Sequence, residues 1–204
     1  MSSSTTSRRS YHHGDLRNVL VEQARALAEE VGPEHLTVRS LAARAGVSHA
    51  AAYHHFADKN AILRAVAVEA FAELRARMRA AADSPDAMTS FIGMAQAYLG
   101  FALERRAAFK FMWSPELCMP PGEPDPLETA QRGLATDIDE VLARHKERLR
   151  PGDERLPMLA LWSMVHGYTL IVVDTPAFKG APPQDLQGIA AALIVTLTNG
   201  LLVP

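Results

Sequence analysis

The chain has 204 residues, of which 48% are hydrophobic and 6% aromatic, and its formal net charge is −2 at pH 7. This length suffices for one or two small domains with a substantial core, and a core rich in Ala and Leu favours helices. The single cysteine, Cys118, excludes an intrachain disulfide framework. We find no uncharged apolar run of 18 or more residues and therefore expect no membrane span.

Residues 1–10, MSSSTTSRRS, are rich in Ser and Thr and lack the apolar core of a secretion signal. We expect this segment to be a disordered leader and the protein to be cytoplasmic. Arg8 and Arg9 either reach DNA as a basic arm or only keep the leader soluble. Both interpretations stay open at the level of sequence.

The first predicted helix covers residues 15–31. Its apolar residues recur at spacings of three and four, which is typical of a helix with one buried face; they are Leu16, Val19, Leu20, Ala24, Leu27 and Val31. Gly32 and Pro33 end the helix. We expect it to brace the two short helices that follow.

Residues 37–59, TVRSLAARAGVSHAAAYHHFADK, predict two short helices around a tight turn. Thr37 caps the first of them, which extends to Ala45, and Gly46 supplies the backbone freedom that a helix C-terminus needs. Ser48 caps the second helix, which ends near residue 54. This is the arrangement of a helix-turn-helix, and the alternative is two amphipathic helices packed in an all-helical core.

One extended motif carries a family resemblance: Thr37-x-Arg39-x-Leu41-Ala42-x-x-Ala45-Gly46-Val47-Ser48, then Tyr53-x-His55-Phe56-x-x-Lys59 and Leu63. Over roughly residues 11–65 the chain closely resembles the TetR-type transcriptional regulators, and residues 11–17 are similar to the opening of one subgroup. Ala52 departs from the pattern, because family members more often carry a bulkier Leu there. That change weakens one core contact and leaves the DNA-reading face intact.

The resemblance implies nine DNA-contacting residues. We expect four of them to face bases, namely Arg39, His49, Ala50 and Ala51. The other five are expected to hold phosphates, namely Thr37, Ser48, Tyr53, His55 and Lys59.

Charge is distributed unevenly along the chain. Residues 1–60 contain seven Lys and Arg against six acidic residues, together with six of the eight histidines, whereas the remainder has fourteen basic and seventeen acidic residues. A weakly basic head on an acidic body suits a protein that binds DNA through one end only.

The rest of the chain predicts an all-α body. A long helix over residues 58–82 joins head and body, and the resemblance implies that it is the lever of induction. Further helices are expected over 86–105, 127–149, 154–173 and 184–202, with a Pro- and Gly-rich loop over 115–126. The predicted organisation is a leader at 1–10, a helix-turn-helix domain at 11–58, and a ligand-binding and dimerisation domain at 59–204.

The two closing helices carry more apolar surface than a small body can hide. A homodimer through a four-helix bundle accounts for this surface and would present two recognition helices to double-stranded DNA at a near-palindromic operator. The alternative is a monomer that buries both helices.

A pocket for a small hydrophobic or amphipathic effector is expected in the body. The candidates are its aromatic and Met residues: Phe91, Met94, Tyr98, Phe101, Phe109, Met112, Trp113, Trp162 and His166. Each of them is alternatively a plain core residue. The string Trp162-x-x-x-His166-Gly167 resembles the C-terminal domain of a TetR subgroup, and we favour a packing role for its Trp and His.

Other classes of function find little support. The sequence has no phosphate-binding glycine loop, no HExxH or CxxC pair and no nucleophile elbow, so we predict no enzyme, no cofactor and no metal site. Asp137, Asp139 and Glu140 are expected to form a solvated helix face. An all-helical ligand carrier whose head has lost DNA binding remains the alternative to a ligand-responsive repressor.

Overall fold

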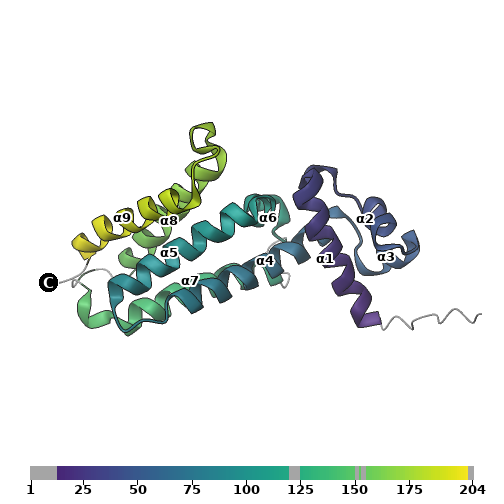
Figure 1. The fold of residues 1–204 in the computed structure, drawn as a ribbon. Coiled ribbons are helices and arrows are strands. Elements are labelled where there is room, and N and C mark those ends of the chain that lie inside the picture. The colour runs from purple at the N-terminus through teal and green to yellow at the C-terminus, as the bar shows by residue number, and fades with distance from the viewer. Residues whose placement is uncertain (1–12, 120–124, 150–151, 153–154, 202–204) are drawn as a thin grey trace, which may run out of the picture.

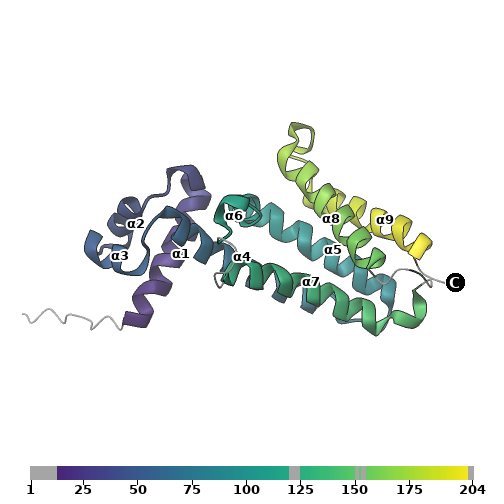
Figure 2. The ribbon, with the colours of Figure 1, turned by 180° about the vertical axis from the view of Figure 1, so that it is seen from behind.

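The computed structural model describes residues 13–119, 125–149, 152 and 155–201, which form helices and turns without a strand. Three helices gather into a head at one end, namely α1 (His13–Val31), α2 (Val38–Ala45) and α3 (His49–His55), and a longer body extends from it (Figures 1 and 2). The all-α prediction is confirmed. The expected leader, residues 1–10 with Arg8 and Arg9, lies outside the described residues, as does Tyr11 at the start of the predicted helix-turn-helix domain.

Helix α4 (Lys59–Ala81) runs from the head along the body, as the sequence predicted (Figure 1). It contacts α1 in the head and α5, α6 and α7 in the body. Six apolar residues along one side of α4 are buried: Ile62, Leu63, Val66, Ala70, Leu74 and Met78. Phe71 is fully buried as well, so α4 is enclosed on a wide face.

Five further helices build the body: α5 (Ala87–Glu104), α6 (Arg106–Met112), α7 (Pro126–Arg144), α8 (Leu156–Asp174) and α9 (Pro183–Leu201). Helix α5 is central, because it packs against α4, α6, α8 and α9. Single 3₁₀ turns connect the elements at Pro33–His35, Pro115–Leu117, Lys146–Arg148 and Pro176–Phe178.

The end of α4 and the start of α5 approach each other unusually closely at Gly93. A Cβ atom built on Gly93 would lie only 2.3 Å from the carbonyl oxygen of Ala81. A side chain at this position would therefore push the two helices apart, so the missing Cβ sets their spacing at the far end of the body.

Asp137 corrects one expectation. We expected it on a solvated helix face, but its side chain is 1% exposed and accepts hydrogen bonds from two arginines of α4. Arg75 Nε donates to it at 2.6 Å and Arg79 Nε at 2.8 Å. Its predicted neighbours, Asp139 and Glu140, are exposed. The Asp137 cluster therefore fastens α7 to the last two turns of α4.

Two details of the predicted helices were wrong. Val31 was assigned to the buried face of the first helix but is 45% exposed. It is the last residue of α1, at the end of the helix. The helix expected to reach residue 149 ends at Arg144. There His145 turns inward and packs edge-on against the Phe91 ring, with 5.9 Å between ring centroids.

Helices α8 and α9 are buried on one face and apolar on the other. Five large apolar side chains of these two helices are more than a third exposed: Leu156, Leu159, Ile171, Ile189 and Val195. Ile189 is exposed although Leu186 and Ile194 on the same helix are buried. Close approach of a neighbour is possible at Gly167 and Gly188, where an added Cβ would meet nothing within 4 Å.

Helix α8 also modifies the membrane expectation. By length and composition, Leu156–Asp174 is the one helix among the described residues that is apolar enough to cross a membrane, although the sequence was expected to contain no such stretch. A single helix of this kind is weak evidence for a span. Here α8 packs against α5, α7 and α9 on one side. Because its other side is open to solvent, only 22% of its apolar segment is buried.

The Asp137 cluster predicts a specific loss of stability. Asp137→Asn should lower the free energy of unfolding by about 2 kcal/mol, less than the 3–5 kcal/mol typical of a fully buried pair, because both arginines still reach water. Urea unfolding followed by circular dichroism measures the change. Asp139→Asn, on the exposed side of the same helix, is the control and should stay within about 0.5 kcal/mol of the parent. Equal effects of the two substitutions would contradict the assigned role of Asp137.

Candidate nucleic-acid interface and body cavity

Helix α2 is positioned by caps at both ends. Thr37 Oγ1 accepts a hydrogen bond from Ser40 N at 2.9 Å, and Ser40 Oγ accepts one from Thr37 N at 3.0 Å, which completes a reciprocal capping box. At the other end Gly46 adopts the left-handed conformation, with φ of 67°. Leu41 and Ala42 are fully buried, so the helix presents its opposite face to solvent.

Helix α3 follows after three residues and is held by its own cap and by one small core residue. Ser48 Oγ accepts a hydrogen bond from Ala51 N at 3.2 Å, as predicted. Ala52 is fully buried, which confirms that the departure from the family pattern falls on the inner face. His49 and Ala50 are exposed at the start of the helix. The exposed Ala50 at the start of α3 has a small side chain, which allows the helix to approach base edges closely.

Contacts with α1 fix the orientation of this helix pair. Arg44, at the end of α2, makes a two-pronged ion pair with Glu30 at 2.6 and 2.7 Å and also donates to Gln23. The guanidinium of Arg17 lies over the ring of Phe56, 5.4 Å from its centroid, just after α3. Helices α2 and α3 are thus each tied to α1 near one end.

Eight of the nine predicted DNA contacts lie on α2, on α3 or at their N-caps, and the ninth, Lys59, is the first residue of α4. Arg39, His49 and Ala50 are exposed, and Tyr53 is 54% exposed. Ala51, His55 and Lys59 are partly buried.

Lys59 Nζ donates to the carbonyl oxygen of Glu34 at 3.0 Å. The side chains of Thr37 and Ser48 serve as caps, so the hydroxyl oxygen of each already accepts a backbone N–H. The roles of these residues on DNA stay predictions.

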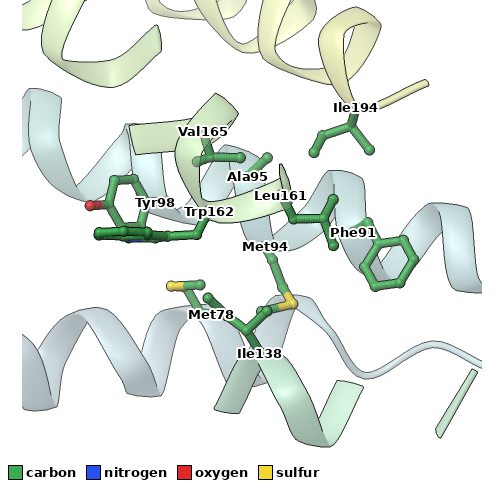
Figure 3. A pocket seen from close by; sticks show the side chains of 10 residues that line it. All are labelled: Met78, Phe91, Met94, Ala95, Tyr98, Ile138, Leu161, Trp162, Val165 and Ile194. Carbon is green, nitrogen blue, oxygen red and sulfur yellow. The ribbon is translucent and has the colours of Figure 1, made fainter. Parts of the chain in front are cut away.

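A cavity of about 30 Å³ lies inside the body, between α4, α5, α7, α8 and α9. Its lining is almost wholly apolar: Met78, Phe91, Met94, Ala95, Tyr98, Ile138, Leu161, Trp162, Val165 and Ile194. Figure 3 shows the rings of Tyr98 and Trp162 at one end and the side chains of Phe91 and Ile194 toward the other. The present volume has room for only a water molecule or two.

Four of the nine predicted pocket residues line this cavity, namely Phe91, Met94, Tyr98 and Trp162. The other five, which are Phe101, Phe109, Met112, Trp113 and His166, lie outside its lining. Among these, Phe101, Phe109 and Met112 are fully buried core residues. Sequence reasoning missed the aliphatic lining contributed by several helices, because only the assembled fold brings those residues together.

An aromatic cluster adjoins the Tyr98 end of the cavity. Tyr98 Oη and His166 Nδ1 are hydrogen bonded at 2.8 Å. The His166 ring stacks on Trp162 with a centroid distance of 5.5 Å and an interplanar angle of 16°. Trp113 lies against both, 5.0 Å from His166 and 6.0 Å from Trp162. The predicted packing of Trp162 with His166 is present, and the cluster brings Tyr98 Oη, the His166 imidazole and Trp113 Nε1 close to this end of the cavity.

Burial sets the charge state of this cluster. It lowers the pKa of the His166 imidazole, so the ring is neutral at pH 7. Burial also raises the pKa of the Tyr98 phenol far above its ordinary range, and a polar contact from the Trp113 indole opposes part of this rise. That contact is too poor in geometry to count as a hydrogen bond, because the buried Trp113 Nε1 has no partner at hydrogen-bond distance and angle among the described residues. One donor in this neutral, low-dielectric site therefore lacks a well-formed hydrogen bond.

A carboxylate of the head caps a helix of the body. The N-cap residue of α6, Arg105, provides no side-chain cap. Instead, the two carboxylate oxygens of Glu29 on α1 accept hydrogen bonds from Ala107 N and Ala108 N, each at 3.2 Å. This contact connects the head to the body at a second place, away from α4.

Comparison with known proteins gives a consistent picture. The sequence matches the family described as bacterial regulatory proteins, tetR family, over residues 20–66. It matches the tetracyclin repressor-like C-terminal domain over residues 91–197. No curated protein matches the sequence.

Several solved structures share the fold across nearly the whole chain. A protein of unknown function from Rhodococcus sp. RHA1 is 29% identical, with a TM-score of 0.79 over 96% of this chain and 100% of that one. A TetR-family transcriptional regulator from Pectobacterium atrosepticum is 22% identical, with a TM-score of 0.72 over 97% and 99%. The fatty acid degradation regulator FadR from Bacillus halodurans is 16% identical, with a TM-score of 0.70 over 92% and 97%.

The lowered pKa of His166 predicts a pH-dependent stability. Between the lowered pKa and the ordinary histidine value of about 6.5, the unfolded chain binds more protons than the native protein. The contribution of His166 is therefore intact above this range and is lost as the pH falls through it. His166→Gln should lower the free energy of unfolding by about 1 kcal/mol at pH 7.5, because the hydrogen bond to Tyr98 is lost. Between pH 7.5 and pH 5.5 the variant should then lose less stability than the parent, because it no longer has the histidine that titrates. Urea unfolding at both pH values measures this, and parallel losses in the two proteins would contradict it.

Proposed function

Because the chain belongs to the TetR family of bacterial regulatory proteins, we propose that it represses transcription as a homodimer on a near-palindromic operator. A small-molecule effector that binds the body releases it from that DNA. The protein is a DNA-binding transcriptional regulator with a helix-turn-helix head. Repression, the form of the operator and the response to an effector are the parts that we propose, together with action in the cytoplasm.

The observation that carries the proposal is the capped, outward-facing pair α2–α3. Arg39, His49 and Ala50 present a guanidinium, an imidazole and a small side chain on one exposed surface. A guanidinium and an imidazole are suited to base edges, and the small Ala side chain admits the helix deeply into a major groove. Thr37, Ser48, Tyr53, His55 and Lys59 flank this surface, where phosphates would lie. We therefore keep the division into base-facing and phosphate-holding residues.

A dimer follows from the exposed apolar face of α8 and α9. Ile171 is 52% exposed and Leu159 is 45% exposed, on an outer face where Gly167 and Gly188 leave room for a second helix pair. Apolar patches of this kind usually mark interfaces. A two-fold axis through this face builds a four-helix bundle and gives the dimer two heads, which match two half-sites one helical turn of DNA apart.

The effector would act through the cavity, because α4 supplies one of its walls. Met78 on α4 lines the cavity, and the same helix begins at Lys59 beside the head. A ligand that favours one position of α4 shifts the separation of the two heads, and the operator affinity changes by the difference in its binding to the two states. The proposed domains are accordingly the helix-turn-helix domain of residues 11–58 and the ligand-binding and dimerisation domain of residues 59–204.

Selection of bound duplexes from a random DNA library tests the proposal. The purified protein at moderate salt should enrich an inverted repeat whose half-sites lie about one turn of DNA apart. Ile171→Asp should give a monomer by sedimentation and lose most of its affinity for that repeat. Val31→Asp replaces an equally exposed apolar residue of the head and should remain dimeric. Weak, salt-sensitive binding without any enriched sequence would refute the operator and favour a ligand carrier.

Two head variants test the division of labour on the selected operator. Tyr53→Phe removes one hydroxyl from an exposed side chain and should weaken binding to all sequences alike, by roughly tenfold, because one phosphate hydrogen bond is lost. His49→Ala should relax preference at one base position by about 1–3 kcal/mol. Binding isotherms against the operator and its single-base variants measure both. A uniform loss in both proteins would show that His49 does not read a base.

A further inference from the structure

The chemistry of the body cavity restricts the kind of effector that the proposed regulator accepts, and the following inference rests on that proposed function. The ten residues that line the cavity include no charged side chain. Arg75 and Arg79, which flank Met78 on α4, are both bound to Asp137. Burying an ionised group in such a site costs several kcal/mol when no counter-charge is present.

The cavity must enlarge before it holds an organic molecule, and two methionines provide the means. Met78 and Met94 are 4% and 6% exposed and lie together on the same side of the cavity as Ile138 (Figure 3). Methionine is unbranched and changes rotamer readily, so it accommodates a ligand at lower cost than the surrounding branched or aromatic residues. The apolar part of an effector therefore belongs where these two side chains now lie.

One specific polar contact lies just outside the lining at the other end of the cavity, behind Trp162. Tyr98 and His166 satisfy each other through their 2.8 Å hydrogen bond. Trp113 Nε1, next to them, is buried and unpaired among the described residues. An indole nitrogen is a donor only, and a buried donor without a well-formed hydrogen bond carries an energetic cost. A ligand atom that accepts a hydrogen bond at this point would remove that cost.

We infer that the effector is an uncharged, largely apolar molecule with a hydrogen-bond acceptor at one end. Its apolar part displaces Met78 and Met94, and its acceptor, a carbonyl or ether oxygen, receives the N–H of Trp113. Carboxylates of the same shape are rejected, because the site has no cation to pair with them. Because the lining has no charged group, the protein selects among neutral molecules by how well their shape fits the cavity.

Matched pairs of an ester and its carboxylate test the inference on the purified full-length protein at pH 7.5. We would use methyl octanoate with octanoate and methyl adamantane-1-carboxylate with adamantane-1-carboxylate, one linear and one compact pair. The chain has two tryptophans, Trp113 and Trp162, and both lie in the cluster, so their fluorescence and the Tm report binding. At least one ester should bind ten times more tightly than its carboxylate. Equal or tighter binding of the carboxylates, or no binding of any of the four, would overturn the inference.

Variants then locate the acceptor. Trp113→Phe keeps an aromatic ring and removes the donor, so ester affinity should fall roughly three- to tenfold. Phe101→Leu is the control, because Phe101 is fully buried on α5 and belongs neither to the cavity lining nor to the aromatic cluster, and the ester affinity of this variant should equal that of the parent. Equal losses in both variants would overturn the role of Trp113. The ester and carboxylate comparison on the unaltered protein stands even if Trp113→Phe does not fold.

The two proposals fail separately. If the protein selects an inverted repeat but prefers carboxylates, only the effector chemistry is wrong. If esters bind and raise the Tm but no DNA sequence is enriched, the regulator proposal is wrong and the binding chemistry stands. Addition of the preferred ester to the protein–operator complex joins the two measurements, and release of the DNA is the expected result.

Discussion

The packing of α4 is the constraint on which the rest of the molecule depends. One continuous helix supplies core residues to the head near Ile62, to the middle of the body near Phe71 and to the cavity at Met78. A helix of 23 residues behaves as a fairly stiff rod about 35 Å long. Its two ends therefore cannot adjust independently, and any change at the cavity wall is felt where the head begins.

Two further contacts set where this rod lies. Asp137 fastens α7 to Arg75 and Arg79 in the last two turns of α4, and Gly93 lets α5 come into contact with the end of the same helix. The ion-pair cluster is directional and the glycine contact is steric, so together they restrict both sliding and tilting. The body therefore fixes α4 at the end far from the head.

The head was predictable because its signals are local. Thr37, Ser48 and Gly46 each act on residues within one helical turn, so their spacing in the sequence already contains the geometry of α2 and α3. The body was less predictable, because its decisive contacts join distant segments. Nothing near Asp137 in the sequence indicates its arginines 58 and 62 residues away. Cavity residues such as Ile138 and Ile194 look like ordinary core until five helices meet around them.

The N-terminus of α6 in the body is capped by Glu29 of the head, so its hydrogen bonds need both parts of the protein. The donors belong to Ala107 and Ala108 in the body and the acceptor belongs to the head, so neither part alone satisfies this helix end. A chimera that joins this body to the head of a related regulator inherits two unpaired amide groups unless the new head carries a carboxylate at the same place. An exchange of DNA-binding heads must therefore preserve a carboxylate at the position of Glu29. The domain boundary between residues 58 and 59 gives no sign of this requirement, because Glu29 lies far from it in the sequence.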